Sequence, residues 1–102
     1  MGTHGSPTDP LLRNVTRRRI VIHGVVQGVF FRDTLRRLAD RHGVSGWARN
    51  RWDGTVEAVF EGSEEDVERL VAFAREGPRG ASVERVDVHD ENPEGLSGFS
   101  VG

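Results

Sequence analysis

The stretch Gly24-Val25-Val26-Gln27-Gly28-Val29-Phe30-Phe31-Arg32 separates a β-branched run from a pattern typical of a helix. The run is Ile20-Val21-Ile22, and its alternation predicts a strand over residues 17–24. A loop with glycines at both ends can turn its backbone N–H groups inward, and a helix N-terminus adds unpaired N–H groups and the positive end of a dipole. Arg32 can place two donors on the same anion. We therefore expect a cradle for a phosphate or a carboxylate at this junction.

The helix after this loop has its apolar residues on one face, spaced three or four positions apart. They are Phe31, Leu35, Leu38, Ala39 and His42. Gly43 can adopt the left-handed conformation that ends a helix. Arg41-His42-Gly43 matches the RHG triplet of histidine phosphatases, in which that triplet follows a strand in a much larger domain. We interpret it here as the end of a helix.

Residues 44–50 and 55–61 each alternate between two faces, which predicts two strands. Asp53-Gly54 between them is a strong turn signal, so we expect an antiparallel hairpin. Asn50 then lies at the loop end of its strand.

A second helix is predicted from Ser63, with Asp66 three residues on as a capping partner, to Gly77-Pro78. Its apolar stripe comprises Val67, Leu70, Val71, Phe73 and Ala74. Alternation over residues 83–89 predicts a fourth strand, and Phe99 and Val101 indicate a short final segment.

The order β-α-β-β-α-β predicts an α+β fold, a ferredoxin-like split β-α-β sandwich with an antiparallel sheet and both helices on one face. Residues 1–16 are predicted to be a flexible leader, because Gly, Pro, Ser, Thr and Asp mix there without periodicity. Residues 17–102 form the expected folded domain. We expect the Arg17-Arg18-Arg19 run to face solvent at the entry of the first strand.

Composition excludes several kinds of chemistry. The 102 residues contain no cysteine, and all 14 basic residues are arginine, so cysteine nucleophiles, thiolate zinc sites, a Walker lysine and Schiff-base catalysis are absent. The net charge of −2 gives no basic field, and we expect no nucleic-acid partner. No apolar run is long enough for a membrane span or a secretory signal, so a cytoplasmic protein without a membrane partner is expected. The four histidines lie far apart in the sequence, and no metal site is predicted.

Three motifs occur in order along the chain: GVVQGVFFR from residue 24, GVSGWARN from residue 43, and WDGTVEAVFEG from residue 52. Together they closely resemble the acylphosphatase family over roughly residues 17–101. The resemblance implies a small ferredoxin-like enzyme, with no cofactor or metal, that hydrolyses the carboxyl-phosphate anhydride of an acyl phosphate to a carboxylate and inorganic phosphate, water attacking phosphorus. We expect it to act as a monomer.

By the same resemblance, Arg32 corresponds to the catalytic arginine that binds phosphate and Asn50 to the asparagine that positions the attacking water. The expected phosphate-binding loop comprises Gln27, Gly28, Val29, Phe30, Phe31 and Arg32.

Alternatives remain at this point. The same sheet occurs in RNA-recognition and metabolite-sensing domains, although Arg19, Val21 and His23 on one strand face are a poor stacking platform for bases. Acylphosphatase-like domains also begin larger hydrogenase-maturation proteins that handle carbamoyl phosphate. Because this chain has one domain and no cysteine-rich segment, we expect a free-standing enzyme. Trp47 and Trp52 could contact the acyl group, but packing or partial cover is the favoured interpretation.

Overall fold

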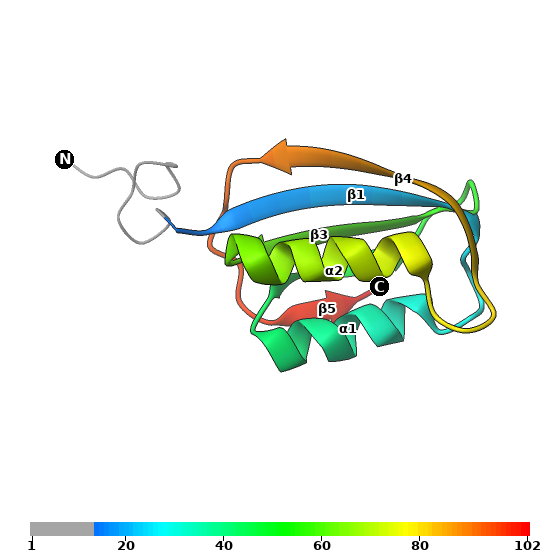
Figure 1. Ribbon diagram of the computed structural model, residues 1–102, viewed down its shortest axis with the longest axis horizontal. Coiled ribbons are helices and arrows are strands. Elements are labelled where there is room, and N and C mark those ends of the chain that lie inside the picture. Colours follow the sequence, from blue (N-terminus) through cyan, green and yellow to red (C-terminus); the bar gives the residue numbers. More distant parts are fainter. Residues whose placement is uncertain (1–13) are drawn as a thin grey trace.

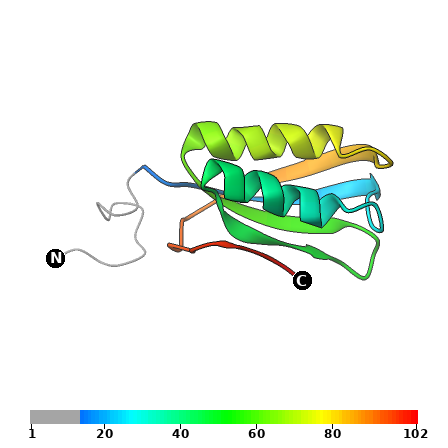
Figure 2. The ribbon, with the colours of Figure 1, turned by 90° about the horizontal axis from the view of Figure 1, so that it is seen from below.

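In the computed structural model, which describes residues 14–102, two helices cover one face of a five-stranded sheet (Figures 1 and 2). The elements are β1 (Thr16–Val25), α1 (Phe31–His42), β2 (Ser45–Asn50), β3 (Val56–Gly62), α2 (Glu64–Glu76), β4 (Ser82–Glu91) and β5 (Phe99–Val101). The predicted ferredoxin-like α+β fold is confirmed. Of the predicted leader, residues 1–16, the first 13 lie outside the described residues. Thr16 already belongs to β1. None of the described helices is long and apolar enough to cross a membrane.

The strand order is β4-β1-β3-β2-β5, and the first four strands pair antiparallel as predicted. The short fifth strand, β5, is added at one edge and pairs parallel to β2, so the whole sheet is mixed. β4 ends beside the start of β1, because Glu91 pairs with Arg17. The chain then crosses at that end to the β2 edge, so β5 starts where β2 starts and runs in the same direction (Figure 1).

The core lies between the sheet and the helices. Ile20 and Ile22 of β1 and Ala58 and Phe60 of β3 are completely buried on the helix side. From the helices, Phe31, Leu35, Ala39, Val67, Leu70 and Ala74 close the same cluster. α1 packs on β2 and β5, whereas α2 packs on β1 and β4. Each helix therefore covers one half of the sheet.

The opposite face of the sheet carries a network of ion pairs rather than free charges. We call it the arginine–glutamate network; its members are Arg17, Arg19, Arg49, Glu57, Glu61 and Glu91. The expectation that the Arg17–Arg19 run faces solvent is wrong at Arg17, which is only 5% exposed. Its guanidinium is enclosed because it pairs with both Glu61 and Glu91, at 2.7 and 2.8 Å.

Candidate active site

The strand register brings the ends of β1, β2 and β3 to one edge of the sheet. Ile22 of β1 pairs with Val56 of β3, and Val56 also pairs with Asn50 of β2. Since β1 and β2 run in the same direction, the loop after β1 and the turn after β2 leave the sheet at the same end. α1 starts there too, directly after the loop (Figure 1).

The loop between β1 and α1 is folded by two left-handed residues. Gly28 has φ +76°, and Phe30 has φ 60° and ψ 26°. A left-handed residue followed by right-handed helical residues turns successive N–H groups to one side and forms a concave nest for an anion. The loop predicted to bind phosphate therefore contains two left-handed residues just before α1.

The first turn of α1 has no side-chain cap, in contrast to α2. At α2, the Ser63 Oγ accepts from the N–H of Asp66 at 3.2 Å, as the sequence predicts. At α1 the cap residue is Phe30, whose side chain offers no acceptor. Its carbonyl accepts from the N–H and Oγ1 of Thr34, which anchors the cap residue. The cap residue therefore provides no side-chain acceptor for the first N–H groups of α1, at the end of the helix where the dipole favours an anion.

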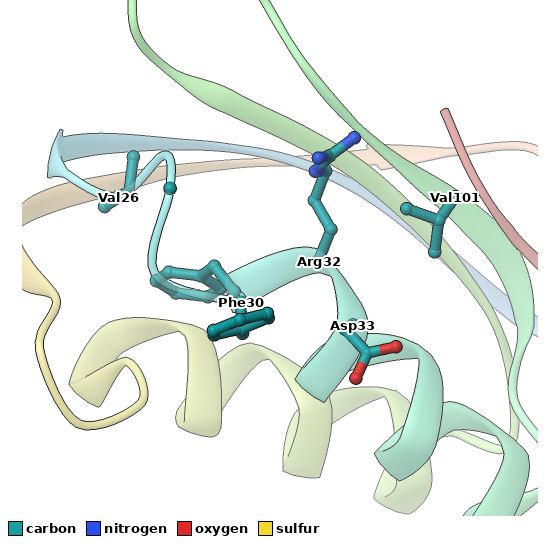
Figure 3. A pocket seen from close by; sticks show the side chains of 7 residues that line it. Val26, Phe30, Arg32, Asp33 and Val101 are labelled. Carbon is teal, nitrogen blue, oxygen red and sulfur yellow. The ribbon is translucent and has the colours of Figure 1, made fainter.

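Arg32 reaches into a pocket beside this helix start. The pocket has a volume of about 230 Å³ and is lined by Val26, Gly28, Phe30, Phe31, Arg32, Asp33 and Val101 (Figure 3). In Figure 3 the Arg32 side chain lies on the same side of the pocket as Val101, and the Asp33 carboxylate points away from Arg32. Asp33 instead pairs with Arg36 and Arg37 at 2.6 and 2.9 Å, and these pairs hold the pKa of its carboxyl below the usual value.

The Arg32 guanidinium is also linked indirectly, by way of Gly102, to β2, the strand that carries Asn50. Its Nη1 donates to the backbone oxygen of Gly102, whose N–H donates to the carbonyl of Ala48 in β2 at 3.0 Å. Ala48 is completely buried on the helix side of the sheet. Because side chains alternate along a strand, Asn50 lies on that same side, towards α1.

Asn50 does not line the Arg32 pocket. It is exposed and lies in a separate hollow of about 380 Å³ with Arg49, Arg51, Trp52 and Glu57. The strand of Asn50, β2, is not next to β1, which leads into the loop, because β3 lies between them. The hairpin pairs β2 with β3, and β3 takes the place beside β1. The two expected catalytic residues thus lie at the same end of the sheet, Arg32 at the start of α1, which packs on β2 and β5, and Asn50 at the end of β2.

Gln27 contributes a contact that sequence reasoning missed. Its side-chain amide donates to the carbonyls of Arg51 and Thr55 in the β2–β3 turn, at 2.7 and 2.9 Å. We expected only the backbone of Gln27 to take part in the loop. A local sequence pattern gives no sign of these partners, which are 24 and 28 residues away.

Gly24 lies in β1, which continues one residue beyond the strand predicted over residues 17–24. It pairs with Val83 of β4 beside a bulge. A Cβ atom at Gly24 would lie 2.1 Å from the Ser82 carbonyl oxygen. Glycine is required there by the close approach of two strands, and the cradle starts after Val25.

The tryptophans lie away from the Arg32 pocket. Trp47 packs on the open face of the sheet between the guanidinium groups of Arg19 and Arg49, at 5.5 and 5.0 Å from its ring centre. Trp52 is 95% exposed at the β2–β3 turn. Among residues 14–102, no group of three or more His, Asp or Glu side chains is arranged to hold a metal ion.

These features define a small ferredoxin-like α+β protein with a left-handed loop before the uncapped start of its first helix. The sequence model of the acylphosphatase family matches residues 18–101. The chain is 51% identical to an acylphosphatase of Haloarcula marismortui, over 84% of this chain and 94% of that protein. It is 54% identical to an acylphosphatase of Thermococcus kodakarensis, over 83% of this chain and 93% of that one.

A solved acylphosphatase from Coxiella burnetii has a similar structure. It superposes with a TM-score of 0.84 at 34% identity and covers 88% of this chain and 95% of its own. The chain therefore belongs to the acylphosphatase family.

Proposed function

We propose that Arg32 and the amides of the Gln27–Phe31 loop bind the phosphoryl group, and that Asn50 positions the attacking water, in the acylphosphatase reaction of this protein. The reaction splits the carboxyl-phosphate anhydride of an acyl phosphate into a carboxylate and inorganic phosphate. The observation that supports this proposal best is the uncapped start of α1, next to a left-handed loop and the Arg32 pocket.

Phosphoryl transfer needs little covalent help from a protein. Its transition state is loose, and the negative charge spreads over three equatorial oxygens. Fixed N–H groups and a guanidinium placed around those oxygens stabilise the charge without reorganising during the reaction. Arg32 supplies two parallel donors and the loop amides supply the rest. No Asp or Glu side chain among residues 14–102 pairs with Arg32.

The attacking water requires orientation more than deprotonation. The Asn50 amide both accepts and donates hydrogen bonds, so it can hold a water in line with the bond that breaks. Electrons of the water oxygen form the new P–O bond, and the electron pair of the old bond leaves with the acyl carboxylate. The carboxylate is a good leaving group, so a strong general base is not required. A phosphate oxygen of the substrate can take the proton of the water.

We further propose that the protein works in the cytoplasm as a monomer and without a metal ion. The expected substrate is a small acyl phosphate, since the binding groups address only its phosphoryl end. Light scattering of the purified protein tests the monomer, and assays with EDTA test the metal independence.

The site is tested by Arg32→Ala and Asn50→Ala, assayed in EDTA with an aromatic acyl phosphate and with inorganic phosphate as inhibitor. Removing one donor of this kind lowers kcat about 10²-fold or more. We expect Arg32→Ala to lose both turnover and inhibition by phosphate. Asn50→Ala should lose turnover and keep the phosphate inhibition constant, because it acts on the water and not on the phosphoryl group.

Two results contradict these roles. Near-normal turnover by Arg32→Ala, with the fold intact by circular dichroism, excludes Arg32 as the phosphoryl ligand. Loss of phosphate inhibition in Asn50→Ala places Asn50 in the cradle instead of at the water.

A further inference from the structure

The Gln27 side chain joins the two halves of the proposed site. It starts in the loop that carries the phosphoryl-binding amides and reaches the turn that follows Asn50. Its Nε2 donates to the Arg51 carbonyl at 2.7 Å and to the Thr55 carbonyl at 2.9 Å. A primary amide nitrogen has two N–H groups, so both donors of Gln27 are used within the protein.

The two carbonyls that Gln27 contacts are those that close the β2–β3 turn. The Arg51 N–H donates to the Thr55 carbonyl at 2.9 Å, and the Gly54 N–H donates to the Arg51 carbonyl at 3.2 Å. The Asp53 carboxylate holds Thr55 through its N–H and its hydroxyl, at 3.1 and 2.6 Å. The turn is therefore held by several hydrogen bonds of its own, and Gln27 contacts the two residues at its base, Arg51 and Thr55.

The register of the sheet explains how Gln27, in the loop after β1, reaches the base of the β2–β3 turn. The pairing of β1 with β3 ends at Ile22 and Val56, so the residues that follow Ile22 run beside the chain that enters β3. β2 does not pair with β1, because β3 lies between them. The phosphoryl-binding loop and the strand of Asn50 thus have no direct strand-to-strand connection, and the side chain of Gln27 bridges them at this end of the sheet.

We propose that Gln27 is a positioning residue that fixes Asn50 relative to the phosphoryl-binding loop through the β2–β3 turn. This inference rests on the proposed roles of Arg32 and Asn50. In-line attack depends on the distance between the water and phosphorus, and a misplacement of about 1 Å lowers the rate by as much as 10²-fold. The side chain of Gln27 sets that distance without touching the substrate, since its two N–H donors face backbone carbonyls.

The test compares Gln27→Met, which keeps the length of the side chain and removes both donors, with Gln27→Asn, which keeps the donors and shortens their reach. We expect both variants to lower kcat by about 10-fold or more, within the range that misplacement produces. The inhibition constant of inorganic phosphate should stay within about 2-fold, because Arg32 and the loop amides are retained. Ser63→Ala is the matched control: it removes the two hydrogen bonds that the Ser63 side chain makes with Asp66 at the α2 cap, and kcat should not change.

A double-mutant cycle separates positioning from a general structural role. If Gln27 acts through Asn50, adding Gln27→Met to Asn50→Ala causes little further loss of kcat, since no positioned water remains to be misplaced. Independent losses that multiply, or an unchanged kcat in both Gln27 variants, overturn the inference while leaving the roles of Arg32 and Asn50 in place. If Asn50→Ala alone has normal kcat, the proposed water site itself is wrong, and the coupling is overturned with it.

Discussion

Phe30, in the proposed cradle, has a left-handed backbone and an exposed aromatic side chain, both of which are unfavourable. It is the one residue other than glycine with positive φ among residues 14–102, and its side chain is 82% exposed. A left-handed conformation costs a residue with a side chain about 1–2 kcal/mol. Backbone strain of this kind concentrates at functional sites, where the surrounding structure maintains it. Phe30 directly precedes α1 and lines the pocket together with Phe31 and Arg32.

Phe30→Gly should therefore stabilise the fold. Glycine removes the left-handed penalty, and little burial is lost because the ring is exposed. The greater freedom of glycine in the unfolded chain offsets part of the gain. We expect an increase in the free energy of unfolding of about 0.5–1 kcal/mol, measured by urea denaturation. A decrease of that size shows instead that the ring packs against the protein and that the conformation is not strained.

Individual residues differ in how far the sequence predicts them. The loop from Gln27 to Arg32 could be found because its glycines, its position before a helix and its arginine each have a local meaning. The side-chain contacts of Gln27 could not, because they depend on β3 lying beside β1. The burial of Arg17 was not predicted for the same reason. It comes from Glu61 and Glu91, which the sequence does not place next to Arg17.

At the scale of elements, periodicity and end signals predicted both helices and the first four strands. Gly43 has the expected left-handed conformation after α1, with φ 68°, and Ser63 caps α2. The parallel pairing of β5 was not predicted, since three residues carry no sign of their direction. The two helix starts differ in their caps. α2 begins after a serine whose side chain accepts from one of its N–H groups, whereas α1 begins after a phenylalanine, which offers no acceptor.

Across the whole molecule, the arginine–glutamate network links β4, β1, β3 and β2 on the face away from the helices. Burial acts to raise the pKa of Glu57, but hydrogen bonds from Arg49 and Arg19 outweigh it and hold that pKa below the ordinary value. Burial opposes the shift at Glu61 as well, where the Glu94 N–H and Arg17 lower the pKa. For Glu91, Arg19 and then Arg17 lower the pKa.

These shifts predict loss of stability in acid. A carboxyl whose pKa is lower in the folded than in the unfolded state stabilises the fold above its unfolded pKa, and that contribution disappears as the pH falls through its folded pKa. The urea midpoint should therefore be nearly constant from pH 7 to about pH 5 and fall steadily below about pH 4, near the ordinary glutamate value. Glu57→Gln should show a shallower fall than the parent protein. A midpoint that stays constant down to pH 3 contradicts the role of the network.

The central claim is that the loop from Gln27 to Arg32, with the start of α1, binds the phosphoryl group. Titration of the ¹⁵N-labelled protein with inorganic phosphate, followed by amide chemical shifts, tests this most directly. We predict that the largest shifts occur at Gly28, Val29, Phe30, Phe31 and Arg32 and disappear in Arg32→Ala. Shifts that concentrate elsewhere in the chain, with the amides of these residues unchanged at saturating phosphate, would contradict the account.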